Sequence, residues 1–325
     1  RFKVETEDFK YSIRVSILPV ISGEKIVMRL LAENTESLSL EQLGFLGKAL
    51  ERVRDNLARP SGAILITGPT GCGKTTTLYS IMGILNTSDV NISTIEDPIE
   101  YRMPRINQTQ VNSKIGLTFA SGLRVLVRQD PDIIMVGEIR DSETAGLAIN
   151  AALTGHLVLS TLHTTGAAGS IPRLIDMGVE PFLISSTLNM IIAQRLVRKF
   201  YSGKEKYKLK TTDLKNLEKY CDLNKILEIL KEEKLINQKA TAEDIEFYKA
   251  KPSKECPDGY KGRIGIFEVL QISDPIKELI IQKANTKDIA NQAIKEGMRT
   301  MIEDGFVKAA KGLTSIEEIL RVITE

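Results

Sequence analysis

The sequence has no tryptophan, and only 5% of its 325 residues are aromatic. Surfaces that bind single-stranded nucleic acid stack bases on aromatic rings, so this scarcity argues against such a surface. Positive charge is not in excess either, because 44 Lys and Arg face 42 Asp and Glu and leave a net charge of +2. A chain so close to neutrality lacks the broad basic field of nucleic-acid-binding proteins, and we expect no nucleic-acid partner.

Long apolar runs and paired cysteines are also missing. The longest apolar segments, such as 63–66 and 133–136, are far shorter than a membrane-spanning helix, which needs about 18 residues. The three cysteines, Cys72, Cys221 and Cys256, are odd in number and lie far apart. This pattern excludes a disulfide framework and favours a reducing compartment such as the cytoplasm.

The N-terminal region resembles part of a small mixed domain. Its first ten residues have mixed charges and no apolar stretch, so no signal peptide is visible. Alternating apolar residues predict strands over 11–18 and 26–31. We assign 1–33 to a fragment of an α+β domain and 34–38 to a polar linker. Because the chain has no initiator Met, we expect it to be cut from a longer protein.

Strand and helix patterns alternate from Ser39 onwards. Ser39 and Gln42 form a capping-box pattern, which predicts that a single helix begins here and runs to about Leu57. Short, continuous apolar runs predict strands at 62–67, 91–96, 132–137 and 156–161. Helical patterns lie between them, at about 74–85, 118–129 and 141–154. Continuous apolar strands are typical of a parallel sheet covered on both faces, so we predict a doubly wound α/β core over 39–197.

The composition changes after this core. Residues 198–258 are dense in Lys, Glu and Asp, with a few apolar positions at helical spacing. They predict a charged, mostly helical insertion, whose charged residues most simply form a solvated face. Residues 259–325 are expected to form a compact helical cap at the C-terminal end.

A phosphate-binding motif follows the first predicted core strand. Residues 68–75, GPTGCGKT, fit the P-loop pattern G-x-x-x-x-G-K-[ST] between a strand and a helix. In this pattern backbone N–H groups surround phosphate oxygens, the lysine reaches the β- and γ-phosphates, and the hydroxyl binds Mg²⁺. We therefore assign nucleotide binding to Gly68, Pro69, Thr70, Gly71, Cys72, Gly73, Lys74, Thr75 and Thr76, with Thr75 also a Mg²⁺ ligand.

Two of the predicted strands end in carboxylates. Glu138 follows the apolar strand 132–137, where P-loop enzymes hold Mg²⁺ or its water ligands. Glu96, Asp97 and Glu100 lie within five residues at the end of another strand. These three carboxylates could orient water or form a solvated turn, and the residues alone leave both readings open.

The chain has two histidines, His156 and His163, seven positions apart around the last predicted core strand. This odd spacing puts them on opposite strand faces unless the chain bends, so we expect no metal pair. A sensor that hydrogen-bonds phosphate or the acidic strand ends fits these residues, and so does a buried structural histidine.

Some arginines are candidates for stabilising transition-state charge, in the same subunit or in a neighbouring one. They are Arg14, Arg29, Arg124 and Arg128. The last two are spaced i,i+4 on one face of a predicted helix, a spacing that is also common for ordinary surface pairs.

Four of these segments together resemble one known family along essentially the whole chain. They read GPTGCGKTTTLYS, TIEDPIEY, GLRVLVRQDPDIIMVGEIRD and TGHLVLSTLHTTGA. These segments are similar to the Walker A motif, Asp box, Walker B motif and His box of the secretion ATPases, which drive type II secretion and type IV pilus assembly. Segments nearer the ends, RVSILPVISGEKIVMRLL and GYKGRIGIFEVL, also resemble parts of this family.

The resemblance implies a RecA-like P-loop core, with 1–33 as the end of a PAS-like second N-terminal domain. It also implies a homohexameric, Mg²⁺-dependent ATPase that is cytoplasmic and peripherally associated with the inner membrane. Such a motor would assemble a type IV pilus-like filament by acting on a polytopic inner-membrane platform protein. The missing N-terminal part would bind a docking protein. A type II secretion ATPase is the alternative, and a hexameric nucleic-acid translocase is a more distant one.

The same resemblance assigns roles to single residues. Glu138 matches the Walker B glutamate, Glu96 and Glu100 match the Asp box, and His156 and His163 match the His box. Between the two candidates for the general base, Glu96 and Glu138, we favour Glu138. The four arginines named above fall where this family places arginines that contact the nucleotide.

The insertion departs from the family pattern. In the extension and secretion branch it usually carries four cysteines that bind zinc, whereas retraction ATPases lack most of it. Here 198–258 contains only Cys221 and Cys256. A structural zinc site needs four ligands, so we predict that the insertion has no zinc and folds around a small apolar core of its own.

Overall fold

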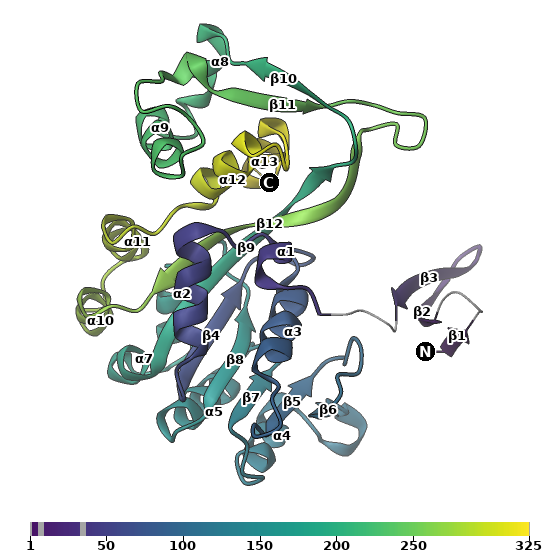
Figure 1. The fold of residues 1–325 in the computed structure, drawn as a ribbon. Helices are drawn as coiled ribbons and strands as arrows, with labels where there is room; N and C mark the ends of the chain where they lie inside the picture. The colour runs from purple at the N-terminus through teal and green to yellow at the C-terminus, as the bar shows by residue number, and fades with distance from the viewer. Residues whose placement is uncertain (1, 6–9, 33–36, 325) are drawn as a thin grey trace.

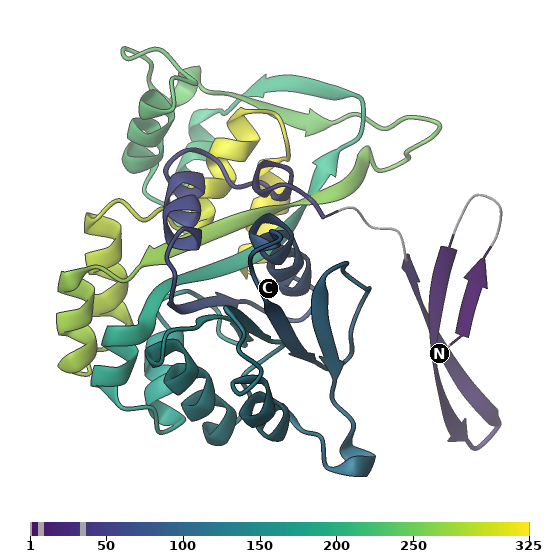
Figure 2. The same cartoon turned by 60° about the horizontal axis from the view of Figure 1, so that its bottom comes forward.

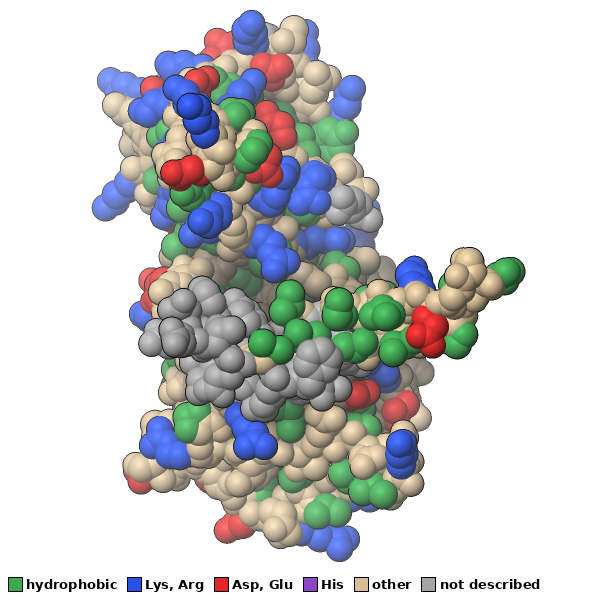
Figure 3. Space-filling view, turned by 90° about the vertical axis from the view of Figure 1, so that its right-hand side faces the viewer, with side chains coloured by type: hydrophobic (Ala, Val, Ile, Leu, Met, Phe, Trp, Pro, Cys, Tyr) green, Lys and Arg blue, Asp and Glu red, His purple; other side chains and the backbone are tan. Residues whose placement is uncertain are grey.

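The computed structural model describes residues 2–5, 10–32 and 37–324 (Figure 1). Strands β1 (Phe2–Glu5), β2 (Lys10–Val20) and β3 (Gly23–Ala32) form an antiparallel sheet in that order. The two strands predicted near the N-terminus are therefore confirmed. Several apolar side chains of this sheet are exposed, among them Ile17, Met28 and Leu30 (Figure 3).

The central sheet of the described residues has the order β12-β9-β4-β8-β7-β5-β6. In chain order its strands are β4 (Gly62–Thr67), β5 (Ile92–Glu96), β6 (Ile106–Gln110), β7 (Ile133–Val136), β8 (Leu157–Leu162), β9 (Leu188–Phe200) and β12 (Tyr260–Gln271). All neighbouring pairs are parallel except β12 with β9. The α/β class and the four predicted core strands are confirmed.

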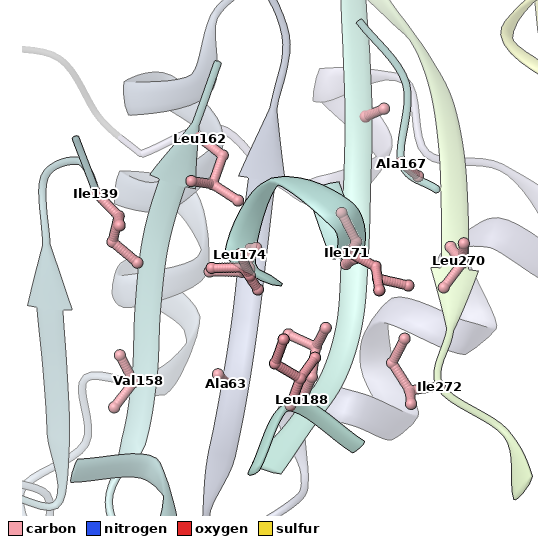
Figure 4. Packing of buried hydrophobic residues seen from close by; sticks show 14 of the residues in the cluster. Ala63, Ile139, Val158, Leu162, Ala167, Ile171, Leu174, Leu188, Leu270 and Ile272 are labelled. Carbon is pink, nitrogen blue, oxygen red and sulfur yellow. The ribbon is translucent and has the colours of Figure 1, made fainter. Parts of the chain in front are cut away.

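Helices cover both faces of this sheet, because successive strand residues point to opposite sides. In β4, Ala63 and Leu65 belong to one apolar core, and Ile64 and Ile66 belong to the other. The first core is covered by α4 (Phe119–Leu126), α5 (Ser142–Leu153), α6 (Ser170–Asp176) and α7 (Pro181–Thr187). Figure 4 shows Leu174 and Ile171 of α6 against these strands. The second core is covered by α1 (Leu40–Leu43), α2 (Gly47–Leu57) and α3 (Lys74–Leu85).

The single helix predicted from Ser39 to Leu57 is wrong, because it is broken into α1 and α2. The capping box of Ser39 and Gln42 is present and begins α1. Gly44 then ends this helix in the left-handed region at φ 107°. A Cβ atom there would lie 2.6 Å from Ile264 of β12, so this close approach requires glycine.

The insertion is less helical than predicted. It contains α8 (Thr211–Leu217) and α9 (Leu223–Glu232), but also an antiparallel ribbon of β10 (Lys204–Lys208) and β11 (Glu246–Ala250). Within the insertion, a short 3₁₀ turn at Ala242–Asp244 precedes β11. A second 3₁₀ turn, at Ser113–Ile115, belongs to the core and follows β6. Lys and Arg side chains gather over the insertion (Figure 3).

Residues 259–325 were expected to be a helical cap, but their first segment, β12, completes the central sheet. The helices that follow are α10 (Asp274–Ile281), α11 (Thr286–Lys295), α12 (Met301–Ala310) and α13 (Ile316–Thr324). α12 and α13 lie against the ribbon (Figures 1 and 2), and one apolar core joins Leu230 and Phe247 of the insertion to Phe306 and Ile319. The insertion therefore does not have the separate core that we predicted. Within the described residues, no helix has both the length and the apolar composition needed to cross a membrane.

Candidate nucleotide site

The phosphate-binding loop lies between β4, which ends at Thr67, and α3, which begins at Lys74. Gly68 has a φ of 146°, and a Cβ atom there would lie 2.5 Å from the Gln194 carbonyl, so only glycine fits. The buried Gln194 side chain donates to the Cys72 carbonyl at 2.7 Å and accepts from the Thr77 hydroxyl at 2.9 Å. Gln194 of the neighbouring strand β9 thereby ties the second half of the loop to the first turn of α3.

Lys74 is the cation of this loop. Its Nζ donates to the carbonyls of Gly68 at 2.7 Å and Pro69 at 3.1 Å, which keeps the ammonium above the loop. Burial lowers the pKa of Lys74, and the charges of Cys72 and Glu138 oppose this shift. The ammonium and the N-terminal N–H groups of α3 together form a site for phosphate oxygens.

A pocket of about 550 Å³ opens at this edge of the sheet. It is lined by the phosphate-binding loop, by the ends of β5 and β7, and by residues beyond β8. The predicted site residues on its wall are Thr70, Gly71, Gly73, Lys74, Thr75, Thr76, Glu96, Glu100, Glu138 and His163. These side chains converge because the carboxyl ends of parallel strands meet at one sheet edge.

Glu138 and His163 lie side by side in this pocket. The Glu138 carboxylate, only 14% exposed, has one oxygen 3.4 Å from His163 Nε2 and the other 2.6 Å from Arg140. His163 follows the end of β8, and the next residue, Thr164, donates its N–H to the Thr67 hydroxyl at 2.9 Å. This contact fixes the loop that carries His163 beside the phosphate-binding loop.

Glu96 and Glu100 occupy different depths in the pocket. The Glu96 side chain is 3% exposed and accepts hydrogen bonds from Thr94, Tyr79 and Gln108. Burial raises the pKa of Glu96, and those hydrogen bonds lower it in part. Glu100 also lines the pocket but is only partly buried, in the loop that follows β5.

The sequence model of the family described as "Type II/IV secretion system protein" matches residues 1–321. The chain belongs to this family. It is 47% identical to "Type II secretion system protein E" of Xanthomonas campestris, over 99% of this chain and 54% of the relative. It is 44% identical to "Type IV pilus assembly ATPase PilB" of Myxococcus xanthus, over 94% of this chain and 52% of that relative. The chain thus spans about half the length of these relatives.

Solved structures of related ATPases share the fold. The pilus retraction motor PilT with bound ADP aligns with a TM-score of 0.68 and 27% identity, over 98% of this chain and 76% of PilT. The ATPase DotB of Legionella pneumophila aligns with a TM-score of 0.66 and 23% identity, over 99% of this chain and 76% of DotB. The family resemblance that the four motifs carry is therefore confirmed.

His156, matched to the His box of this family, lies away from the pocket. It precedes β8, and its Nδ1 is 2.9 Å from the Ala151 carbonyl. Its own carbonyl accepts the N–H of Gly62 at the start of β4, whereas the phosphate-binding loop follows the end of β4. Seven residues of extended strand separate the two histidines by roughly 20 Å.

Among the described side chains that line the pocket, neither Arg124 nor Arg128 is found. Arg124 of α4 pairs with Glu143 of α5, and Arg128 is exposed just after α4. Arg14 and Arg29 are direct partners on β2 and β3, and their side chains lie outside the part of the chain that the structure describes.

Arg263 and Leu196 also line the pocket, although neither was predicted from the sequence to be a site residue. They come from β12 and β9, far along the chain from the four motifs. Both also line a smaller cavity of about 250 Å³ beside Gly73, with Leu43 and Phe267 on its walls. The only signal for Arg263 was its place in GYKGRIGIFEVL, a segment that carries no phosphate-binding pattern of its own.

Proposed function

We propose that the protein is a hexameric, Mg²⁺-dependent ATPase motor that powers assembly of a type IV pilus-like filament. The observation that carries this proposal is the convergence of Lys74, Glu138 and His163 at one edge of the central sheet. The relatives named pilus assembly ATPases, 43–45% identical, and PilT with its bound ADP support nucleotide binding and turnover at this site.

Each residue then has a defined task. Lys74 and the loop N–H groups bind the β- and γ-phosphates, and His163 contacts the γ-phosphate or the Glu138 carboxylate. Thr75 and Glu138 offer the oxygen ligands that Mg²⁺ prefers, Glu138 partly through water, and the bound ion would neutralise phosphate charge. Glu138 is our general base for the attacking water, because its carboxylate faces the pocket.

The remainder of the pocket is assigned to the nucleoside. Leu196 and Arg263 connect the phosphate pocket with the smaller cavity beside Gly73, which has apolar walls on one side. We place the base and ribose there. Since His156 bonds the Ala151 carbonyl at the other end of β8, we leave it out of the mechanism.

The surroundings of the motor follow from the same family. We propose a homohexamer in the cytoplasm at the inner membrane, acting on a polytopic platform protein. A docking protein would bind a part of the protein outside this chain. Within the hexamer, Arg14, Arg29, Arg124 and Arg128 would approach the nucleotide of a neighbouring subunit.

The test is ATP turnover and nucleotide binding by the full-length protein. Lys74→Ala should abolish binding, because the ammonium contacts phosphate before and during reaction. Glu138→Gln should retain binding but reduce turnover by ~100-fold or more, because a base acts mainly at the barrier. Lys219→Ala and Glu228→Gln, at exposed positions of the insertion, are the matched controls and should behave as wild type. Near wild-type turnover in Glu138→Gln would refute its role, and Glu96 would be tested next.

A type II secretion ATPase is the second candidate, favoured by the 47% identity to the Xanthomonas campestris protein. The two candidate functions are distinguished by the phenotype of a strain of the source organism that carries only the Glu138→Gln allele. Loss of surface filaments with normal protein export supports the pilus motor. The opposite result supports the secretion motor.

A further inference from the structure

A hydrogen-bonded cluster lies beneath the nucleotide pocket and joins three elements of the core. Tyr79 comes from α3, Glu96 from the end of β5 and Gln108 from β6. The Tyr79 ring is fully buried and the Glu96 side chain is 3% exposed. None of the proposed steps of ATP hydrolysis uses Tyr79 or Gln108.

The Tyr79 hydroxyl is at the centre of this cluster. It donates to Glu96 Oε2 and accepts the Glu100 N–H at 3.3 Å and Gln108 Nε2 at 3.4 Å. Gln108 Nε2 has two protons for three acceptors, so its contact with Tyr79, the longest of the three, is a shared hydrogen bond. Burial and the Glu96 charge raise the pKa of Tyr79, so the hydroxyl keeps its proton and remains a donor.

Gln108 holds the chain that follows Glu100. Its Oε1 accepts the Met103 N–H at 2.8 Å, and its Nε2 donates to the Tyr101 carbonyl at 3.2 Å. Together with Tyr79, it ties the backbone of the loop after β5 at three successive points. This loop presents Asp97 and Glu100 to the pocket.

Both oxygens of Glu96 are engaged in the cluster. Oε2 accepts from Tyr79, and Oε1 accepts from the Thr94 hydroxyl at 2.5 Å and from Gln108 at 3.2 Å. A carboxylate held by three donors in a buried place is suited to fixing its neighbours.

We propose that the Tyr79 hydroxyl is a positioning group, which joins the phosphate-binding helix to the Asp-box loop through Glu96 and the Glu100 backbone. The inference rests on the proposed ATPase function. Tyr79 lies five residues after Lys74 on α3, so one rigid helix carries both the phosphate-binding cation and the hydroxyl. Through its bond to the Glu100 N–H, this hydroxyl links the helix that carries Lys74 to the backbone of the loop that carries Glu100. Glu96 acts through the loop as a second positioning residue.

The decisive variant is Tyr79→Phe in the full-length protein, since it removes one oxygen and keeps the buried ring. We expect kcat to fall ~10–100-fold, the size of loss that follows when a group in the active site is misplaced by about 1 Å. The KM for ATP and the Kd for ADP should change less than about threefold. The acid limb of the pH–rate profile should move to higher pH, because Glu96 loses a hydrogen bond that lowers its pKa. Gln108→Leu should lower kcat in the same way, and it provides the test if Tyr79→Phe does not fold.

Tyr260→Phe is the matched control. It removes a hydroxyl that lies 2.8 Å from Ser315, outside the pocket, and should leave kcat within about twofold of wild type. If the wild type hydrolyses ATP and Tyr79→Phe has the same kcat, the positioning role of Tyr79 is wrong, while the proposed ATPase function stands. Parallel losses of kcat, ADP binding and melting temperature in Tyr79→Phe also overturn it, because they indicate only a weakened fold. An inactive wild type overturns the proposed function and the inference with it.

Discussion

The nucleotide edge of the central sheet and the insertion, residues 198–258, are ordered by different interactions. At the nucleotide edge, buried polar groups such as Glu96 and Gln194 have specific hydrogen-bond partners on neighbouring strands and helices. In the insertion, order comes from apolar side chains, and these pack against α12 and α13. A site can therefore be held rigidly by the sheet, while the insertion depends on the C-terminal helices for its shape.

The two regions also treat charge differently. Glu138 is 14% exposed and Glu96 3%, and each contacts groups that the pocket places beside it. In the insertion, Lys206 pairs with Glu246 at 2.7 Å, but both side chains are about half exposed. Exposed pairs of this kind contribute about 0.2–1 kcal/mol, so the charges of the insertion are mainly a solvated surface.

The largest expected effect concerns the nucleotide edge, which we expect to be completed by a neighbouring subunit. Of the candidate arginines, the two with described side chains, Arg124 and Arg128, do not line the pocket. An arginine supplied in trans can be worth ~10³-fold in rate. Specific ATPase activity should therefore rise with protein concentration, and Arg128→Ala or Arg29→Ala should remove most of this rise. Specific activity that stays flat from dilute monomer upward would contradict a shared site.

The next effect concerns the insertion core. Phe247, 1% exposed, contacts Phe306 edge-on with ring centroids 5.9 Å apart. Phe247→Ala should lower the free energy of unfolding by about 3–5 kcal/mol, through the cavity it leaves. Urea titration measures this loss, with Tyr220→Ala, half exposed, as the control. The nucleotide affinity of the folded variant should stay unchanged. A loss of nucleotide affinity together with stability would mean that the insertion and the nucleotide edge are not independent.

A smaller effect depends on pH. Burial alone would raise the pKa of Glu318, but hydrogen bonds from Arg198 and Arg321 outweigh it and lower the pKa to about 2. A carboxyl group whose pKa is lower in the folded than in the unfolded state stabilises the fold at pH values above its unfolded pKa, which is about 4.3 for glutamate. Glu318→Gln should therefore cost about 1–3 kcal/mol at pH 7. This difference should shrink as the pH falls from 4.3 toward 2, measured by urea titration at each pH. A difference that does not vary with pH would rule out this ion cluster as its cause.

The smallest effect is expected from metal removal, which should leave the insertion unchanged. Burial raises the pKa of Cys221 to about 11, so it stays a thiol, and Cys256 Sγ lies 3.3 Å from Asp258 and 3.2 Å from the Tyr260 carbonyl. A structural zinc would contribute ~10 kcal/mol or more. Metal content by mass spectrometry and thermal melts in EDTA test the prediction. Stoichiometric zinc, or a large melting shift without nucleotide, would refute it.

The core strands were predictable because burial on both faces leaves continuous apolar runs, as in Gly62–Thr67 and Ile133–Val136. β6 was missed because its sequence, INQTQ, is mostly polar at the edge of the sheet. The ribbon of the insertion was missed for a related reason. Lys204–Lys208 reads KEKYK, with a single tyrosine among charged residues and no apolar alternation, and its partner β11 lies some forty residues later. Such long-range pairing leaves little local pattern.

The phosphate-binding loop and its helix were determined by the sequence itself. The glycine positions and the spacing of Lys74 and Thr75 are properties of neighbouring residues, so the motif can be recognised without the remainder of the fold. Only the tertiary structure decided which distant side chains complete the site. Arg263, Gln194 and the contact of Tyr79 with Glu96 depend on the strand order of the central sheet. Hydrogen bonds act over about 3 Å, so they exist only where the packed sheet brings these residues together.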